Sequence, residues 1–217
     1  MRCIFCKQDS ATSKSVEHIV PESLGNKEHV LPIGAVCDDC NQYFARKVER
    51  PVLESPMFCL LRANMVIPNK RGRIPKWQPE DGKERPDYRQ MGRFLAKIGL
   101  EVLAHKILSV PSWNDELVDQ PALDEIRRFA RYNEGPDWPF TVRTLYPVNA
   151  TFKEDNQQFE LLHEFDILFT QASEGYLAIV LFGVEMVINL GGRENDGFRR
   201  WLEEHNWASP LYPARDT

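Results

Sequence analysis

Three residues near the N-terminus have the types and spacing that metal-assisted hydrolysis requires. Glu17 and His18 are adjacent, and Asn41 follows after a short stretch of chain. A carboxylate and a neutral amide oxygen are hard ligands, which suit Mg²⁺ or Mn²⁺ better than a second zinc ion. An imidazole with a pKa of about 6.5 is an effective general base at neutral pH. We therefore expect Glu17 and Asn41 to hold a catalytic metal and His18 to activate water, provided that backbone bending brings them to one phosphate.

Two Cys-x-x-Cys pairs flank the Glu-His pair. Cys3 and Cys6 precede it, and Cys37 and Cys40 follow it, the last directly before Asn41. Each pair places two sulfurs on one side of a tight turn, so two pairs supply the four ligands of a tetrahedral structural Zn²⁺ site. We therefore predict that zinc closes the loop that carries the Glu-His pair and fixes the start of the helix that carries Asn41.

The elements that must position these residues form a strand, a loop, a strand and a helix. The apolar and turn patterns predict strands at Val16–Val20 and Leu31–Val36, a loop at Glu22–Val30, and a helix over Asn41–Glu49 that ends near Pro51. This predicts a zinc-bound unit over residues 1–60, followed by a basic loop and linker over residues 61–87.

The apolar and turn patterns of residues 88–217 predict an α+β accessory domain. Apolar spacing predicts a long buried helix over Tyr88–Leu108, and a second helix covers Ala122–Tyr132. The following runs predict an antiparallel β-meander and a closing helix: Phe140–Val148, Phe159–Thr170, Tyr176–Leu190 and then Asp196–His205.

Charge and composition restrict the class of protein. The net charge is −5, but residues 1–75 hold 11 Lys/Arg against 8 Asp/Glu, whereas residues 76–217 hold 16 against 24. A polyanion should therefore meet the N-terminal part. No apolar run reaches about 18 residues, so no membrane span is expected. Five cysteines without an export signal favour the cytoplasm and metal binding over disulfides. Cys59 is left over, and we interpret it as a small buried apolar residue.

These motifs resemble an HNH endonuclease of the ββα-metal superfamily, in the subgroup with a four-cysteine zinc site. The resemblance covers roughly residues 1–55 and is carried by Cys3–Cys6, Glu17–Pro21 and Cys37–Asn41. It implies that Glu17 binds the catalytic metal and that His18 is the general base. In members with four zinc-binding cysteines, it also implies Asn41 as a metal ligand. The implied products carry a 5′-phosphate and a 3′-hydroxyl.

The chain departs from the family pattern in three places. The residue before the histidine is Glu rather than the commoner Asp, and the family's middle Asn has no clear counterpart, with His29 and Pro32 nearby. The final helix position is Glu49 rather than His. A regular α-helix places Glu49 about 80° around the axis from Asn41. Glu49 is therefore the candidate for the remaining metal ligand, with a surface charge as the alternative.

The sequence thus predicts a metal-dependent HNH endonuclease that cuts DNA, with RNA as an alternative substrate and a role in restriction or antiphage defence. The accessory domain would supply substrate choice, a homodimer contact or a regulatory protein contact. The rival is a non-catalytic zinc-knuckle module that binds nucleic acid or protein, in which the three polar residues have ordinary structural roles. Basic residues predicted to contact phosphates are Arg46, Lys47, Arg50, Lys70, Arg71 and Arg73.

Overall fold

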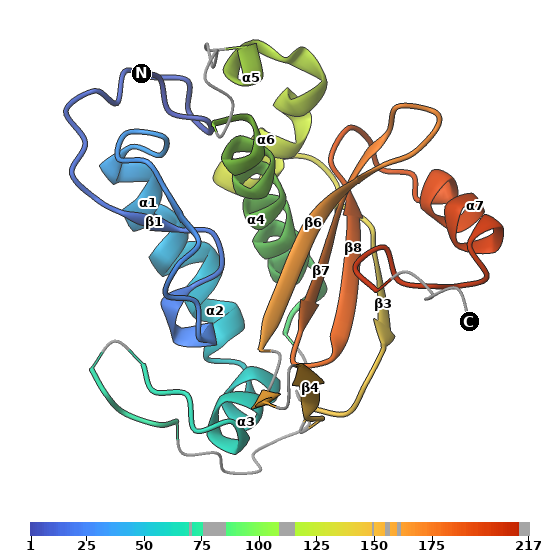
Figure 1. The fold of residues 1–217 in the computed structure, drawn as a ribbon. Coiled ribbons are helices and arrows are strands. Elements are labelled where there is room, and N and C mark those ends of the chain that lie inside the picture. Colours follow the sequence, from blue (N-terminus) through green and yellow to red (C-terminus); the bar gives the residue numbers. More distant parts are fainter. Residues whose placement is uncertain are drawn as a thin grey trace.

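The chain folds around one central helix, α4 (Tyr88–Leu108), with the N-terminal unit on one side and a four-stranded sheet on the other (Figure 1). The computed structural model describes residues 1–69, 71–75, 86–108, 116–148, 150–154, 157–159 and 162–212. The mixture of helices and antiparallel strands confirms the predicted α+β class.

The N-terminal unit begins with a short antiparallel strand pair. β1 (Glu17–His18) pairs with β2 (Val30–Leu31), and the 3₁₀ turn η1 (Glu22–Leu24) lies between them. Both strands are shorter than predicted. β2 is followed directly by Pro32, whose nitrogen carries no hydrogen for a further ladder bond.

The helix that follows is longer than predicted. Three helical segments run on without a break: α1 (Asp38–Phe44), the π-helical turn η2 (Ala45–Glu49) and α2 (Arg50–Leu53). The helix ends at Leu53, two residues beyond Pro51, so it ends near the predicted position but runs through the proline. A proline crowds the carbonyl four residues before it, but here the Arg50 N–H bonds to the Ala45 carbonyl, five residues back. This wider π-turn relieves the crowding. α3 (Pro56–Asn64) comes next.

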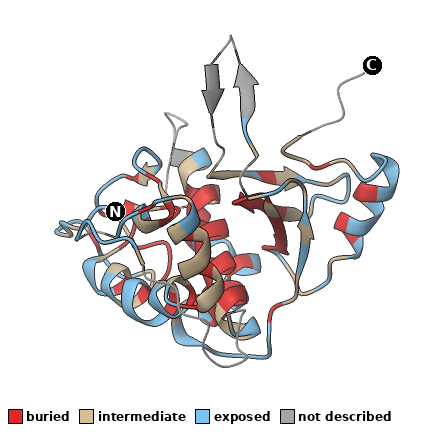
Figure 2. Cartoon of the chain, turned by 90° about the horizontal axis from the view of Figure 1, so that it is seen from below, coloured by how far each residue is buried: buried red, intermediate tan, exposed pale blue. Residues whose placement is uncertain are grey.

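Helix α4 is buried on almost every side, as its apolar spacing predicted (Figure 2). Gly99 lets the sheet approach closely, because a Cβ there would lie 2.5 Å from Leu190 Cδ2. Three polar residues interrupt the apolar surface: Arg93, Lys97 and Glu101 are also buried. They are spaced four residues apart, which places them on one face of the helix.

The four-stranded sheet is antiparallel and has the order β3-β8-β7-β6. Its strands are β3 (Phe140–Thr144), β6 (His163–Phe169), β7 (Gly175–Leu181) and β8 (Val184–Asn189). Alternate residues of β7 face opposite layers: Leu177 and Ile179 join the core with α4, while Tyr176 and Ala178 pack with α7 (Asp196–Glu204). The predicted meander began with Phe140–Val148, but in this sheet only β6, β7 and β8 are consecutive neighbours, and β3 pairs with β8 rather than with β6.

One predicted β-run is in fact a hairpin. Tyr176–Leu190 divides into β7 and β8, because Phe182 and Gly183 both have positive φ values, 52° and 83°. Two such residues form the tight turn that a hairpin favours. Gly183 was the available signal, but the surrounding apolar residues concealed it.

The smaller elements complete the fold. They are α5 (Glu116–Asp119), η3 (Pro121–Leu123), α6 (Asp124–Tyr132) and the ribbon of β4 (Phe152–Glu154) with β5 (Gln157–Phe159). The main apolar core joins residues from Cys3 to Leu190, and a smaller cluster packs the sheet against α7. The predicted domain boundary at residue 60 falls inside α3, and residues 76–85 of the predicted linker lie outside the described residues. The division into domains stays a prediction. Among the described helices, none has both the length and the apolarity to span a bilayer.

Candidate active site and cysteine cluster

The four N-terminal cysteines come together as predicted. Their Sγ atoms all lie within 4.8 Å of one another, and those of Cys6 and Cys37 are 3.7 Å apart. A tetrahedral zinc with Zn–S bonds of about 2.3 Å places neighbouring sulfurs about 3.8 Å apart. Two local features build the cluster: Lys7 has φ 62°, which closes the first turn, and Asp38 accepts the backbone N–H groups of Lys14 and Ser15 beside the second.

The thiols cannot all ionise without a cation. A hydrogen bond with Cys40 lowers the pKa of Cys3 to about 5, and the same bond raises the pKa of Cys40. Burial raises the pKa of Cys6 to about 11. One thiolate therefore forms at the expense of its neighbours, and this donor set fits the charge and softness of Zn²⁺.

An arginine side chain of helix α6 contacts the cysteine cluster. Arg131 of α6 donates from Nε to Cys40 Sγ at 3.2 Å, and its guanidinium carbon lies 3.9 Å from the centre of the Tyr43 ring. Burial alone would lower the pKa of Arg131, but its contact with Cys40 outweighs burial and raises it. Arg131 thus offsets part of the negative charge that four thiolates would leave on a bound zinc.

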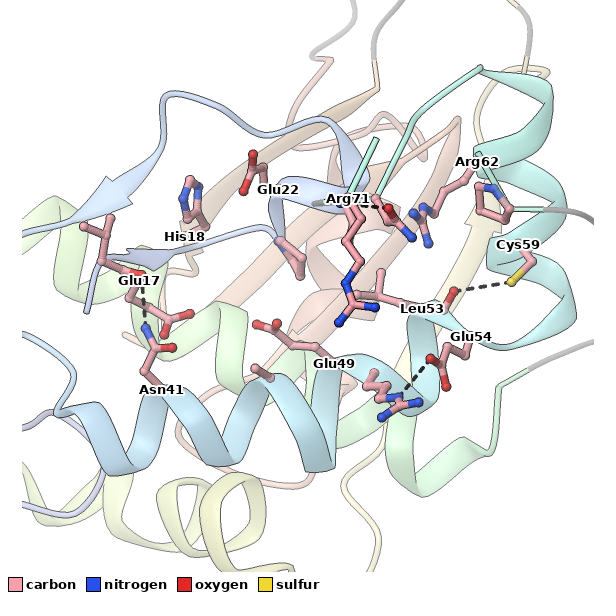
Figure 3. A pocket seen from close by; sticks show the side chains of 17 residues that line it. Glu17, His18, Glu22, Asn41, Glu49, Leu53, Glu54, Cys59, Arg62 and Arg71 are labelled. Atoms are coloured by element: carbon pink, nitrogen blue, oxygen red, sulfur yellow. Dashed lines mark hydrogen bonds and ion pairs between the residues drawn. The ribbon is translucent and has the colours of Figure 1, made fainter. Parts of the chain in front are cut away.

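Glu17, His18 and Asn41 line one cavity of about 570 Å³ between β1 and the α1–η2 helix (Figure 3). Glu17 and His18 are neighbours on β1, and Glu17 points toward the helix while His18 lies higher in the cavity. The Asn41 Nδ2 donates to the Val16 carbonyl at 3.1 Å, which turns Oδ1 toward the Glu17 side. All three side chains line this cavity, with Glu17 and His18 on opposite sides of β1 and the Glu17 carboxylate beside the Asn41 amide (Figure 3).

Glu49 also lines this cavity, although a regular α-helix would turn it away from Asn41. The π-turn between them contains more residues per turn than an α-helix, so the chain rotates less per residue. Glu49 is thereby brought back toward the face that carries Asn41 (Figure 3). The oxygen set of Glu17, Asn41 and Glu49 fits a hard divalent cation.

A buried lysine joins two of these carboxylates. Lys97 Nζ of α4 lies 2.6 Å from Glu17 Oε1, 2.7 Å from Glu49 Oε1 and 2.9 Å from Glu101 Oε2. It also donates to the His18 carbonyl at 3.2 Å. The Lys97 side chain is 0% exposed, against 6% for Glu17 and 15% for Glu49. Lys97 therefore fixes the two carboxylates from behind the cavity.

The charges of this cluster do not cancel. Burial alone would lower the pKa of Lys97, but Glu101, Glu17 and Glu49 together raise it well above its ordinary value. Burial raises the pKa of Glu101 well above its ordinary value, against the attraction of Lys97. Even with Glu101 protonated, two carboxylates face one ammonium group. The remaining negative charge favours a cation, and a carboxylate has a second oxygen with which to bind it.

The basic residues predicted to contact phosphates divide between the cavity and the surface. Arg50 and Arg71 line the cavity, and Arg50 also pairs with Glu54 at 2.8 Å. The other three described residues, Arg46, Lys47 and Arg73, are exposed and lie outside the lining of the cavity. Lys70 lies outside the described residues.

Lys97, Glu101 and Arg62 were not among the residues predicted for the site. Lys97 and Glu101 belong to the polar series at four-residue spacing within a helix otherwise predicted to be buried. That series was a usable signal, because an apolar helix rarely buries charges without partners. Arg62 lines the cavity from α3 and carries no comparable sequence signal.

Residues 3–57 match the family model described as HNH endonuclease. The match covers the cysteine cluster, both strands and the helix that carries Asn41 and Glu49, so it confirms the resemblance for this part of the chain and supports a nuclease-type function. Neither the curated proteins nor the solved structures gave a significant match.

Proposed function

We propose that the protein is a metal-dependent endonuclease that hydrolyses DNA at the cavity of Glu17, His18, Asn41 and Glu49. The observation that carries the proposal is the meeting of these four side chains in one cavity, within the segment that matches the nuclease family. Glu17 and Asn41, with Glu49, would hold Mg²⁺ or Mn²⁺. The bound ion would supply positive charge to the phosphate and to the departing oxygen.

The chain itself would supply the base and the positioning. His18 accepts a proton from water at an imidazole nitrogen, and the water oxygen attacks phosphorus in line with the leaving 3′-oxygen. The products then carry a 5′-phosphate and a 3′-hydroxyl. Lys97 holds Glu17 and Glu49 in place from behind, so little rearrangement is needed when substrate arrives.

The test is cleavage of supercoiled plasmid by wild type, His18→Ala and a matched His205→Ala, in Mg²⁺ or Mn²⁺. His205 is exposed at the end of α7, away from the cavity. We expect His18→Ala to lose at least 10²-fold in rate, the usual contribution of general base catalysis, and His205→Ala to retain activity. Cleavage that persists at the wild-type rate in His18→Ala would contradict the assignment of the base.

The rival proposal is a non-catalytic zinc module that binds nucleic acid or protein. It would be favoured by tight DNA binding without cleavage of plasmid, single-stranded DNA or RNA in either metal. The same substrates distinguish DNA from RNA. A role in restriction or antiphage defence would require phage plaque counts to fall in cells expressing wild type but not His18→Ala.

A further inference from the structure

The end of the cavity opposite Asn41 contains a buried arginine. Arg62 of α3 is only 5% exposed, yet it lines the cavity. Its Nε and Nη2 are buried and have no hydrogen-bond partner among the described residues. Figure 3 shows the guanidinium extending from α3 toward Arg71. Two donor atoms are thus buried beside this end of the cavity with no acceptor in the part of the chain that the structure describes.

This arrangement is unfavourable in the protein alone. An arginine retains its charge even when buried, and a buried charge without a partner is costly. Burial lowers the pKa of Arg62. The neighbouring Glu54 is already paired with Arg50, and the Cys59 thiol donates to the Leu53 carbonyl at 3.6 Å. Cys59, predicted to be buried, is in fact half-buried at the cavity wall.

A structured turn brings a second arginine to the same end. The Asn69 Oδ1 accepts the backbone N–H groups of Arg71 and Arg73, at 2.9 and 3.1 Å, and Gly72 takes a positive φ of 71°. Arg71 is thereby presented over the cavity, where Figure 3 places its guanidinium between Arg62 and Glu49.

We propose that Arg62 and Arg71 form a binding subsite for a phosphate that flanks the cleaved one on the same nucleic-acid strand. The inference rests on the proposed nuclease function and adds a substrate contact beyond the segment that matches the family. Guanidinium groups bind phosphate oxygens in a bidentate manner. The cavity of about 570 Å³ has Glu17, Asn41 and Glu49 toward one end and arginines toward the other, where Glu54 is already paired with Arg50. This arrangement suits consecutive phosphates, one held through a metal and the next held directly.

The decisive measurement is DNA affinity as a function of salt for the zinc-loaded protein, without added Mg²⁺ or Mn²⁺, so that cleavage does not enter. Wild type, Arg62→Gln and Arg199→Gln are titrated against a labelled oligonucleotide between 50 and 200 mM salt. Arg199 is an exposed arginine of α7 and a matched control for charge. We expect Arg62→Gln to bind several-fold more weakly and to make the negative slope of log K against log salt shallower by about 0.7–0.9, the contribution of one phosphate contact. Affinity and slope equal to those of Arg199→Gln would overturn the proposal.

Thermal unfolding separates binding from a structural role. Without DNA, Arg62→Gln should unfold at or above the wild-type temperature, because an unpaired buried charge has been removed. A lower unfolding temperature with unchanged affinity would mean that Arg62 is structural and would also overturn the proposal. If Arg62→Gln does not fold, Arg71→Gln on the exposed turn replaces it in the titration, with the same expected loss and the same contrary result.

Two further binding measurements distinguish a subsite for a nucleic-acid phosphate from a site for free nucleotides. Inorganic phosphate should compete with the oligonucleotide for wild type more strongly than for Arg62→Gln. A mononucleotide that binds as tightly as the oligonucleotide would show that the subsite takes free nucleotides, against the proposal. These binding measurements involve no cleavage, so they can be interpreted even if the nuclease test fails. A protein that cleaves DNA can still show no effect of Arg62→Gln on binding.

Discussion

The N-terminal unit contains two clusters of polar side chains, and each receives a cation from a different helix behind it. Arg131 of α6 contacts the thiol cluster at its edge, through Cys40. Lys97 of α4 lies inside the carboxylate cluster, in contact with Glu17, Glu49 and Glu101. The thiol cluster can be completed by a metal alone, whereas the carboxylate cluster is assembled around a side chain of the protein.

This difference suits the thiol cluster to a structural role and the carboxylate cluster to binding a catalytic ion. Four cysteines fill every coordination position of a tetrahedral zinc and leave it closed to substrate, which suits a structural role. A carboxylate pair anchored by a lysine keeps oxygens oriented while the cavity side stays open. The two clusters should therefore respond differently to substitution.

The largest effect is expected at the thiol cluster. Cys37→Ser should lose the bound zinc and unfold the N-terminal unit, because a structural zinc contributes about 10–16 kcal/mol of apparent binding free energy. Zinc content per chain and far-ultraviolet circular dichroism measure this. Cys59→Ser is the matched control, since Cys59 lies outside the cluster, and it should retain one zinc per chain. A folded Cys37→Ser protein without zinc would contradict the structural role of the metal.

A smaller but still large effect is expected at Lys97. Lys97→Met leaves buried carboxylates without their cation, which should reduce the free energy of unfolding by about 3–5 kcal/mol. Urea unfolding measures this loss. Lys106→Met on the same helix removes an exposed partner of Asp166 and should cost less than about 1 kcal/mol. Equal midpoints for the two variants would show that Lys97 does not hold the carboxylates together.

The smallest effect is expected at Arg131. Arg131→Gln removes one contact at the edge of the thiol cluster and one with the Tyr43 ring, worth about 1 kcal/mol together. Zinc should remain bound, and competition with a chelator should show somewhat weaker retention. The exposed Arg128 of the same helix provides the control, as Arg128→Gln. Complete loss of zinc from Arg131→Gln would mean that the cysteines are not sufficient as ligands.

The same contrast explains what could be predicted from the sequence. The cysteine cluster was predictable because its ligands lie in two short motifs, whose spacing alone defines the geometry. The buried helix over Tyr88–Leu108 was predictable from its apolar spacing. The partnership of Lys97 with Glu17 was not, because it depends on how α4 packs against β1, and no local pattern records that packing.

Two local features were also beyond prediction. Pro51 normally ends a helix, and only the π-helical hydrogen bond before it explains why the helix continues. The hairpin at Phe182 was hidden because an apolar residue occupies a position where turns favour Gly or Asn.

The π-turn has a consequence for the register of the whole segment. A hydrogen bond that spans five residues instead of four is equivalent to one residue inserted into a regular helix. Every position after it, including Pro51 and the start of α3, is shifted by one place relative to α1. Deleting a single residue such as Arg46 would therefore restore an ordinary helix in which Glu49 lies seven residues after Asn41, about 20° around the axis and still on the same face. The π-turn thus absorbs the surplus residue and keeps Glu49 on the face that carries Asn41.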